Sequence, residues 1–297
     1  MSHLIRMTEE PAETNGDEQL SRFRREIGEV IRECRQVEQA ARSARQLWEE
    51  VLALLPQAAE RPFGLLAKLD KLESVVPERA ALVAALRSWA DTLAEEQLTD
   101  YTRLLRRILG PDETVEGRLQ DGYRIRSLIE VRVDYQKYEA TIATPFRARR
   151  LTGDISVYAV AEAIRSELER LFDRPFHAGR FAKELFEAYQ LALVQSGTER
   201  SPGEPVPILA VHKFVVVLRQ SPKAFQSVDS RHFRPYPPDE FAVDLGRLLA
   251  TGQDEVDGWR LRLHPIRKVK DSLYVVNFGT GIGQNYGLLS FQRVHVG

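Results

Sequence analysis

An unbroken heptad pattern at residues 20–55 constrains the fold of this chain more than any other feature of its sequence. Apolar residues recur there at alternating spacings of three and four, as in the a/d seam of a coiled coil. The seam consists of Leu20, Phe23, Ile27, Val30, Cys34, Val37, Ala41, Ala44, Trp48, Val51 and Leu55. The residues between them are mostly polar, so the pattern predicts an amphipathic helix roughly 54 Å long. A helix with one apolar stripe cannot bury that stripe alone and therefore needs a partner.

The two ends of this predicted helix differ in the width of their apolar surface. Leu47, Leu52 and Leu54 widen the seam near its C-terminal end to more than half of the helix circumference, which is typical of a bundle. We therefore expect this end to pack against helices of the same chain, predicted at residues 64–76 and 77–109. The narrower seam at 20–37 stays free for a partner. The predicted partner-binding residues are Leu20, Phe23, Ile27, Val30, Cys34 and Val37.

The positions beside the seam argue against one simple form of that partner. In a parallel homodimer, facing g and e positions would place Glu33 beside Glu38 of the second chain and would form no attractive pair. Such charge pairs normally determine which coiled-coil helices associate. The sequence therefore gives little support to a parallel homodimer, and it leaves open whether the partner is a second copy or another protein.

Composition excludes several classes of protein. The chain has 297 residues, of which 43% are hydrophobic and 29% charged, and its net charge of -1 implies neither a nucleic-acid coat nor an acidic substrate. The longest strongly apolar run, residues 214–218, is far too short to span a membrane, and the N-terminus lacks the apolar core of a secretory signal. The single Cys rules out an intrachain disulfide and fits a reducing cytoplasm, so we expect a cytoplasmic location.

We predict an α+β fold with three parts. Residues 1–16 form a disordered leader, residues 17–110 an all-helical coiled-coil or bundle region, and residues 111–297 a mixed α/β domain ending in a small antiparallel sheet. A hairpin is predicted from strands at 129–135 and 140–146, with a helix from Leu119 onward as the alternative. The other predicted elements are helices at 17–55, 155–172, 180–194 and 239–251, a strand or helix at 211–218, and a meander of strands at 259–264, 272–278 and 286–296.

No sequence motif identifies a catalytic site. The glycine-rich stretch at 278–285 follows a predicted strand, but no helix follows it as a phosphate-binding loop requires, which favours a hairpin loop. The six His residues lack metal-ligand spacing. Asp134 and Glu139 flank Lys137, and this trio is similar to the two acidic residues and the Lys of metal-dependent nucleases. The spacing of the trio differs, however, from the E-x-K motif that such nucleases carry on a strand. We therefore expect no metal site and no cofactor, and the sequence identifies no catalytic residue and no small-molecule substrate.

Clustered basic residues give a second candidate surface. Arg260, Arg262 and His264 alternate along a predicted strand and therefore share one of its faces. Such a face can bind a phosphate backbone, although a solvated face or a site for an acidic protein explains it equally simply. The predicted nucleic-acid-binding residues are Arg147, Arg149, Arg150, Arg260, Arg262, Arg267, Lys268 and Lys270.

Together these patterns favour a non-catalytic adaptor or scaffold subunit of a cytoplasmic multiprotein complex, which docks through the N-terminal coiled coil. The alternative is a nucleic-acid-binding protein that uses the basic C-terminal sheet face. The second alternative is a metal-dependent nuclease or hydrolase whose site includes Asp134.

Overall fold

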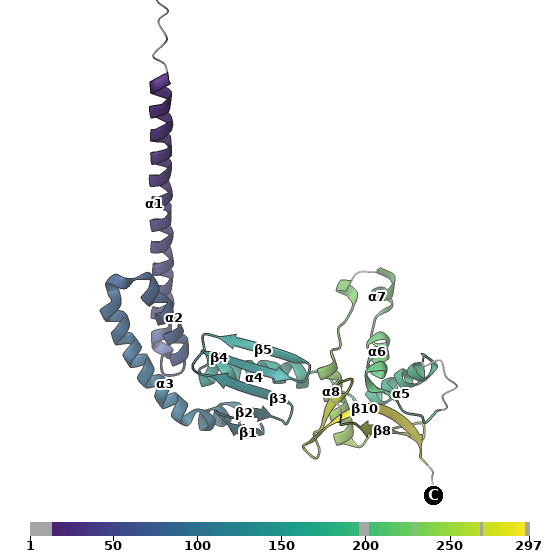
Figure 1. The fold of residues 1–297 in the computed structure, drawn as a ribbon. Helices are drawn as coiled ribbons and strands as arrows, with labels where there is room; N and C mark the ends of the chain where they lie inside the picture. The colour runs from purple at the N-terminus through teal and green to yellow at the C-terminus, as the bar shows by residue number, and fades with distance from the viewer. Residues whose placement is uncertain (1–13, 196–201, 228–229, 268–269, 295–297) are drawn as a thin grey trace, which may run out of the picture.

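A long helix projects from a body that contains two separate antiparallel sheets (Figure 1). This computed structural model describes residues 14–195, 202–227, 230–267 and 270–294. Helices alone make up the N-terminal region, and helices and strands are mixed after residue 110, so the predicted α+β class is confirmed. The expected leader lies largely outside the described residues, and residues 14–16 begin the first helix.

The helical region has three long elements. Helix α1 spans Thr14–Leu54, α2 spans Pro62–Val75 and α3 spans Ala80–Leu109, with short 3-10 turns at Leu55–Gln57 and Pro77–Arg79. Pro62 stands at the start of α2, where its missing N–H costs no helical hydrogen bond. Gly110 ends α3 at a positive φ of 98°, which a side chain would disfavour. The predicted helices are thus confirmed, and α2 packs against both α1 and α3.

The first sheet is a five-stranded meander. Its strands are β1 (Val115–Arg118), β2 (Gly122–Ile125), β3 (Ile129–Asp134), β4 (Glu139–Thr144) and β5 (Arg147–Thr152), paired in chain order. The β3–β4 hairpin confirms the prediction, and the alternative of a helix from Leu119 is wrong. A Cβ on Gly117 would lie 2.2 Å from the carbonyl oxygen of Gly122, so the β1–β2 turn requires glycine there. Helix α4 (Val157–Phe172) packs against this sheet through its buried face.

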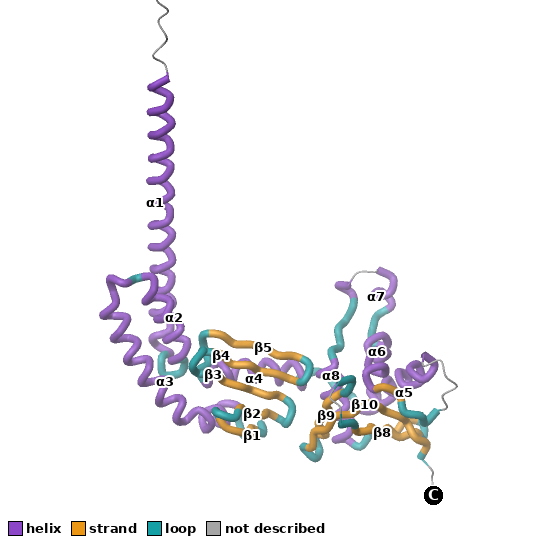
Figure 2. The backbone as a smooth tube through the Cα atoms, viewed as in Figure 1, coloured by secondary structure: helices purple, strands orange, loops and turns teal. Residues whose placement is uncertain are grey.

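The second sheet and its helices follow. The helices are α5 (Ala178–Gln195), α6 (Ile208–Leu218), α7 (Pro222–Ser227) and α8 (Pro238–Thr251), with a 3-10 turn at Ser230–His232. The strands are β6 (Val206–Pro207), β7 (Glu255–Val256), β8 (Trp259–Pro265), β9 (Leu273–Asn277) and β10 (Ile282–Arg293). Residues 211–218 therefore belong to a helix, which settles the alternative left open by the sequence. Figure 2 shows the two groups of strands well separated along the body.

The predicted C-terminal meander is wrong in its strand order. Strand β10 pairs antiparallel with β9 along its first half and with β8 along its second half, so β8 and β9 do not pair as consecutive strands of a meander would. Tyr286 marks the crossing, since it pairs with Leu273 on one edge of β10 and with Pro265 on the other. The twelve residues of β10 make this possible, because one strand of that length can accommodate two shorter neighbours.

Two hydrophobic cores stabilise the body. The first contains the base of α1, helices α2 to α4 and the first sheet, and the second contains α5, α6, α8 and the second sheet. Strand β9 belongs to both, because Leu273 and Val275 point into the second core while Val276 points into the first. Gly246 lets α8 approach this strand closely, since a Cβ there would lie 2.0 Å from the Val276 carbonyl oxygen. The first core includes residues on both sides of position 110, and the expected domain boundary there remains a prediction.

Candidate functional site

The N-terminal half of α1 projects from the body of the molecule (Figure 1). We call the side chains of Phe23, Ile27, Val30, Cys34 and Val37 the apolar stripe. Phe23, Ile27 and Val30 are 57–58% exposed, Val37 is 70% exposed, and Cys34 is exposed as well. No other described part of the chain covers them. Leu20 lies on the same face of the helix by its heptad position, but its side chain is outside the described part.

The C-terminal end of the same helix is covered by its own chain. Val51 is only 2% exposed, and Trp48 and Leu55 pack against the first core. An ion pair between Lys68 Nζ of α2 and a Glu50 carboxylate oxygen of α1, 2.6 Å apart, joins the two helices at this point. The prediction that the base of α1 packs within its own chain is therefore confirmed. Leu52 is an exception among the apolar residues at this end of α1. Helix α2 covers the face of α1 that carries Val51, whereas Leu52 lies beside that face and stays 68% exposed.

Ion pairs within α1 stabilise the exposed half as a helix. Arg22 pairs with Glu26 at 2.8 Å, and Arg42 pairs with Glu38 at 2.6 Å, both at the i,i+4 spacing that brings side chains together on a helix. Two charged residues beside the stripe differ from these. Within the described part of the chain, Arg24 and Glu33 have no ion-pair partner. The stripe is thus flanked by charges that an approaching helix can engage.

Three of the predicted basic residues, Arg147, Arg149 and Arg150, lie on β5 and do not form one surface. Directly paired residues on neighbouring strands point to the same face of a sheet. Arg149 pairs with the buried Ile142 and so lies at the edge of the covered face, whereas Arg150 pairs with Thr141 on the open face. Arg147 pairs with Thr144, on the same side as Arg149. Arg150 is also neutralised, because its guanidinium donates to the Glu139 carboxylate.

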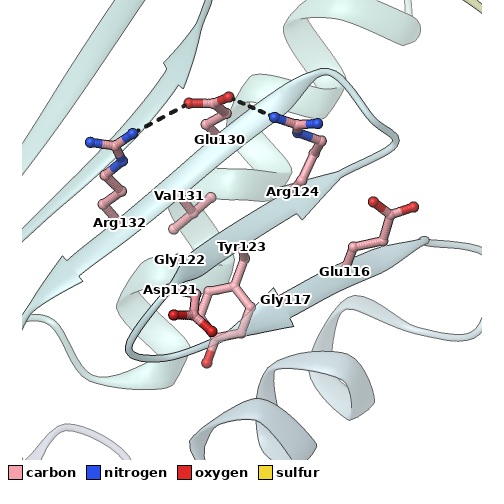
Figure 3. Close-up of a pocket in the computed structure, with 9 residues that line it drawn as sticks. All are labelled: Glu116, Gly117, Asp121, Gly122, Tyr123, Arg124, Glu130, Val131 and Arg132. Atoms are coloured by element: carbon pink, nitrogen blue, oxygen red, sulfur yellow. Dashed lines mark hydrogen bonds and ion pairs between the residues drawn. The ribbon is translucent and has the colours of Figure 1, made fainter. Parts of the chain in front are cut away.

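Opposite charges alternate on the open face of the first sheet (Figure 3). Arg124 donates to Glu130 at 3.0 Å, and Arg132 lies 4.0 Å from the same carboxylate. Glu116 and Asp121 add further negative charge beside a shallow hollow of about 350 Å³. A surface with this balance has no preference for polyanions, and its exposed pairs contribute little to stability. We assign no function to this hollow.

The basic face predicted on the second sheet exists but is partly neutralised. Arg260, Arg262 and His264 pair with Gln292, Ser290 and Leu288 of β10 and share one face, as expected. Arg260 is held by Glu255 at 3.0 Å and Asp254 at 3.9 Å, and His264 Nε2 lies 2.9 Å from the Ser290 hydroxyl. Arg262, Arg267 and Lys270 have no acidic partner within the described part of the chain. Lys268 lies outside the described residues.

A buried charge network between α5, α6 and α8 was not predicted from the sequence. Asp244 is 3% exposed and accepts hydrogen bonds from the Tyr236 hydroxyl at 2.6 Å and from Arg174 Nη2 at 2.9 Å. The guanidinium of Arg219 lies 3.7 Å from the centre of the Tyr236 ring and pairs with Glu184 at 2.7 Å. Burial raises the pKa of Tyr236 well above its ordinary value. These residues line a hollow of about 670 Å³.

The contacts of this network join helices α5, α6 and α8. Its acids are matched by arginines, and the protein contacts described above account for its buried carboxylate. No sequence motif could have revealed it, because its partners lie up to 70 residues apart in the chain. The signal available in the sequence was Asp244, which lies among Phe241, Leu245 and Leu248 on the apolar face of α8.

The other chemical candidates of the sequence have simple structural explanations. Residues 278–281 form the tight turn between β9 and β10, in which the Asn277 side-chain oxygen accepts the N–H of Gly279 at 2.9 Å. The hairpin-loop interpretation of this stretch is therefore confirmed. Asp134 and Lys137 pair at 3.1 Å in the exposed β3–β4 turn, and this hydrogen bond lowers the pKa of Asp134. In the described ranges, no three His, Cys, Asp or Glu residues lie close enough to hold a metal ion.

Every described helix is too short or too polar to cross the hydrocarbon core of a bilayer.

Comparisons with known proteins provide no further guide to function. No family model matches the chain, and neither the curated proteins nor the solved structures contain a significant match to it.

Proposed function

We propose that this protein is a non-catalytic adaptor or scaffold subunit of a cytoplasmic complex, and that it docks through the apolar stripe of α1. The observation that carries the proposal is the exposure of 57–70% at four apolar side chains that share one face of a projecting helix. Single exposed apolar residues are common on protein surfaces and need no explanation. A continuous stripe at coiled-coil spacing is different, because it is the surface that a second helix buries.

The contrast with the base of α1 supports this role. The same heptad pattern continues there, and α2 covers it. The chain therefore uses the pattern for helix packing at the base, and the uncovered half offers an equivalent surface to another helix. The length of the exposed half also favours docking, since residues 21–43 extend roughly 34 Å beyond the covered base.

Charges placed in the stripe test the proposal. Ile27→Glu combined with Val30→Glu would prevent another helix from covering the stripe, because burying an unpaired carboxylate costs several kcal/mol. We expect this variant to lose the partner that co-purifies with the full chain from the native cell and to lose mass in size-exclusion chromatography with light scattering. Arg25→Glu combined with Gln39→Glu, on the opposite side of the helix, is the matched control. Unchanged mass and unchanged co-purification in the stripe variant would contradict the docking role.

Nucleic-acid binding through the second sheet is the second candidate function. It is favoured by Arg262, Arg267 and Lys270, which lie near one another in sequence and have no acidic partner in the described segments. Phosphate contacts would make binding fall steeply with salt concentration. Changing all three residues to Glu should abolish binding to a short DNA or RNA duplex in fluorescence anisotropy. Equal affinity and an equal salt slope in the variant would contradict this candidate.

A further inference from the structure

The apolar stripe also contains information about what covers it. Resting on the docking role proposed above, we infer that the partner is a second copy of this chain, whose α1 lies antiparallel to the first about a twofold axis near residue 32. Three features carry this inference. They are the sizes of the side chains along the seam, the charges beside it, and the length of α1 left uncovered by the rest of the chain.

Side-chain size along the seam suits antiparallel pairing. With the axis near residue 32, each position a faces a position d of the second copy. The facing pairs, with the residue of the second copy named last, are Phe23–Ala41, Ile27–Val37 and Val30–Cys34. Phe23, the largest side chain of the stripe, thus meets the small Ala41, and the other two pairs join side chains of intermediate size, which fills the seam evenly. A parallel pair would instead place Phe23 against Phe23 and Ala41 against Ala41, so that one end is crowded and the other hollow.

The charges beside the stripe favour the same arrangement. In an antiparallel pair, position e of one helix faces position e of the other, which brings Arg24 to Glu38 of the second copy at both ends of the overlap. Arg24 has no ion-pair partner among the described residues of its own chain. Glu38 accepts from Arg42 through one oxygen only and is 62% exposed, so its other oxygen can accept from Arg24. The parallel arrangement offers no attractive pair and sets Glu33 beside Glu38.

Near the axis, one contact is favourable and one is not. Ile31 occupies position e and is 47% exposed, and in the proposed pair it packs against Ile31 of the second copy. Glu33 at position g faces Glu33 of the second copy, and this contact between like charges is repulsive. The contact lies at the solvent-exposed edge of the seam, where solvent and salt weaken the repulsion. The two Arg24–Glu38 pairs and the Ile31 contact therefore outweigh it.

Shifting the helices by one heptad in either direction removes these advantages. An axis nearer the N-terminus brings Glu26 to Glu33 of the second copy and leaves Arg24 without an acidic partner. An axis nearer the C-terminus brings Arg24 to Arg45. That second shift also sets Phe23 level with Trp48, where α1 already packs against the first core. The register about residue 32 is the one that the sequence and the covered base allow together.

The shape of the chain suits this pair as well. The uncovered half of α1 ends near Ala44, which is the first seam residue to pack against the first core. In the proposed register Ala44 lies level with the start of the seam of the second copy, so the overlap uses the whole uncovered length. The two bodies then lie at opposite ends of the shared rod, because each body sits at the base of its own α1 (Figure 1).

Charge reversal tests the proposed pairing. Arg24→Glu sets like charges at both symmetric contacts and should raise the dissociation constant of the dimer about tenfold, measured by sedimentation equilibrium of the full chain. Glu38→Arg should do the same. The chain carrying both changes should return to within about threefold of the original value, because both contacts are attractive again. Arg25→Glu, on the far side of the helix, is the matched control.

Cysteine placement tests the direction independently. The only Cys, Cys34, faces Val30 of the second copy in the antiparallel pair and faces itself in a parallel pair. On mild oxidation, the Val30→Cys chain should therefore form a disulfide-linked dimer, because its two thiols meet across the seam. The original chain, and a chain with Val30→Cys and Cys34→Ser, should each remain unlinked on a non-reducing gel.

The outcomes separate this inference from the docking role. A monomer at all concentrations, additive losses in the doubly reversed chain, or a disulfide between two Cys34 residues would each overturn the antiparallel self-pairing. The docking role would survive any of these results if Ile27→Glu with Val30→Glu still removed a partner of another sequence. If that variant changed neither mass nor co-purification, both would fail.

Discussion

The two halves of α1 have the same sequence pattern and opposite environments. At the base, α2 covers the seam and Val51 is 2% exposed, whereas on the projecting half Val37 is 70% exposed. A heptad pattern therefore shows that a surface can be covered, and it does not show which part of the chain covers it. The difference comes from α2, which returns along the base of α1 after the turn at residues 55–61 and reaches no further.

The largest effect that tests this contrast concerns two neighbouring residues at the base. Val51→Asp places a charge in the first core, and we expect it to lower the free energy of unfolding by about 3–5 kcal/mol or to prevent folding. Leu52→Asp, one residue further on and 68% exposed, should change it by less than about 0.5 kcal/mol. Chemical denaturation followed by circular dichroism measures both. Similar losses would mean that both sides of the base are covered.

The same contrast extends from apolar to charged side chains. Asp244→Asn removes the most deeply buried of the carboxylates that Arg174 and Arg219 contact, and we expect a loss of about 2–4 kcal/mol in the free energy of unfolding. Glu130→Gln, on the open face of the first sheet, should cost no more than about 0.5 kcal/mol, because its two arginine partners are exposed. Urea denaturation at neutral pH compares the two. Equal effects would show that the charge network is solvated.

The features of the fold that the sequence predicted differ in kind from those that it did not. The heptads, the amphipathic helices and the alternating strand at residues 129–134 were predictable, because each is specified by its own local periodicity. Strands β1, β2 and β5 were missed, since they are short and each contains a single β-branched residue beside Gly or Arg.

Features that depend on contacts between distant segments were predicted less well. The strand order around β10 depends on long-range pairing, which no local pattern encodes. Of the candidate sites, the stripe was predicted from its spacing, whereas the division of the basic residues between two sheets required the register of β5 and β8.

A buried histidine adds a dependence on pH to the covered regions. His212 Nε2 lies 2.7 Å from the Tyr236 carbonyl oxygen, and burial lowers the pKa of His212 below its ordinary value of 6.5. The unfolded chain then binds this proton first as the pH falls, so stability is complete above pH 6.5 and is lost below it, by at most about 1.4 kcal/mol per pH unit. His212→Gln should remove this part of the pH dependence, measured by denaturation between pH 7.5 and 5.5. An unchanged slope would mean that His212 is protonated equally in both states.

The smallest expected effect concerns how independently the two halves of α1 behave. Gly28 is the only glycine of the heptad segment, and an added Cβ there would contact nothing within 4 Å. Gly28→Ala should stabilise the projecting half by about 1 kcal/mol, which corresponds to roughly fivefold slower amide hydrogen exchange at residues 21–43. Exchange at the base, near Val51, should not change, because the first core and not the helix itself determines its protection. Slower exchange along the whole of α1 would show that the two halves open together, and the contrast between them would then lie in exposure alone.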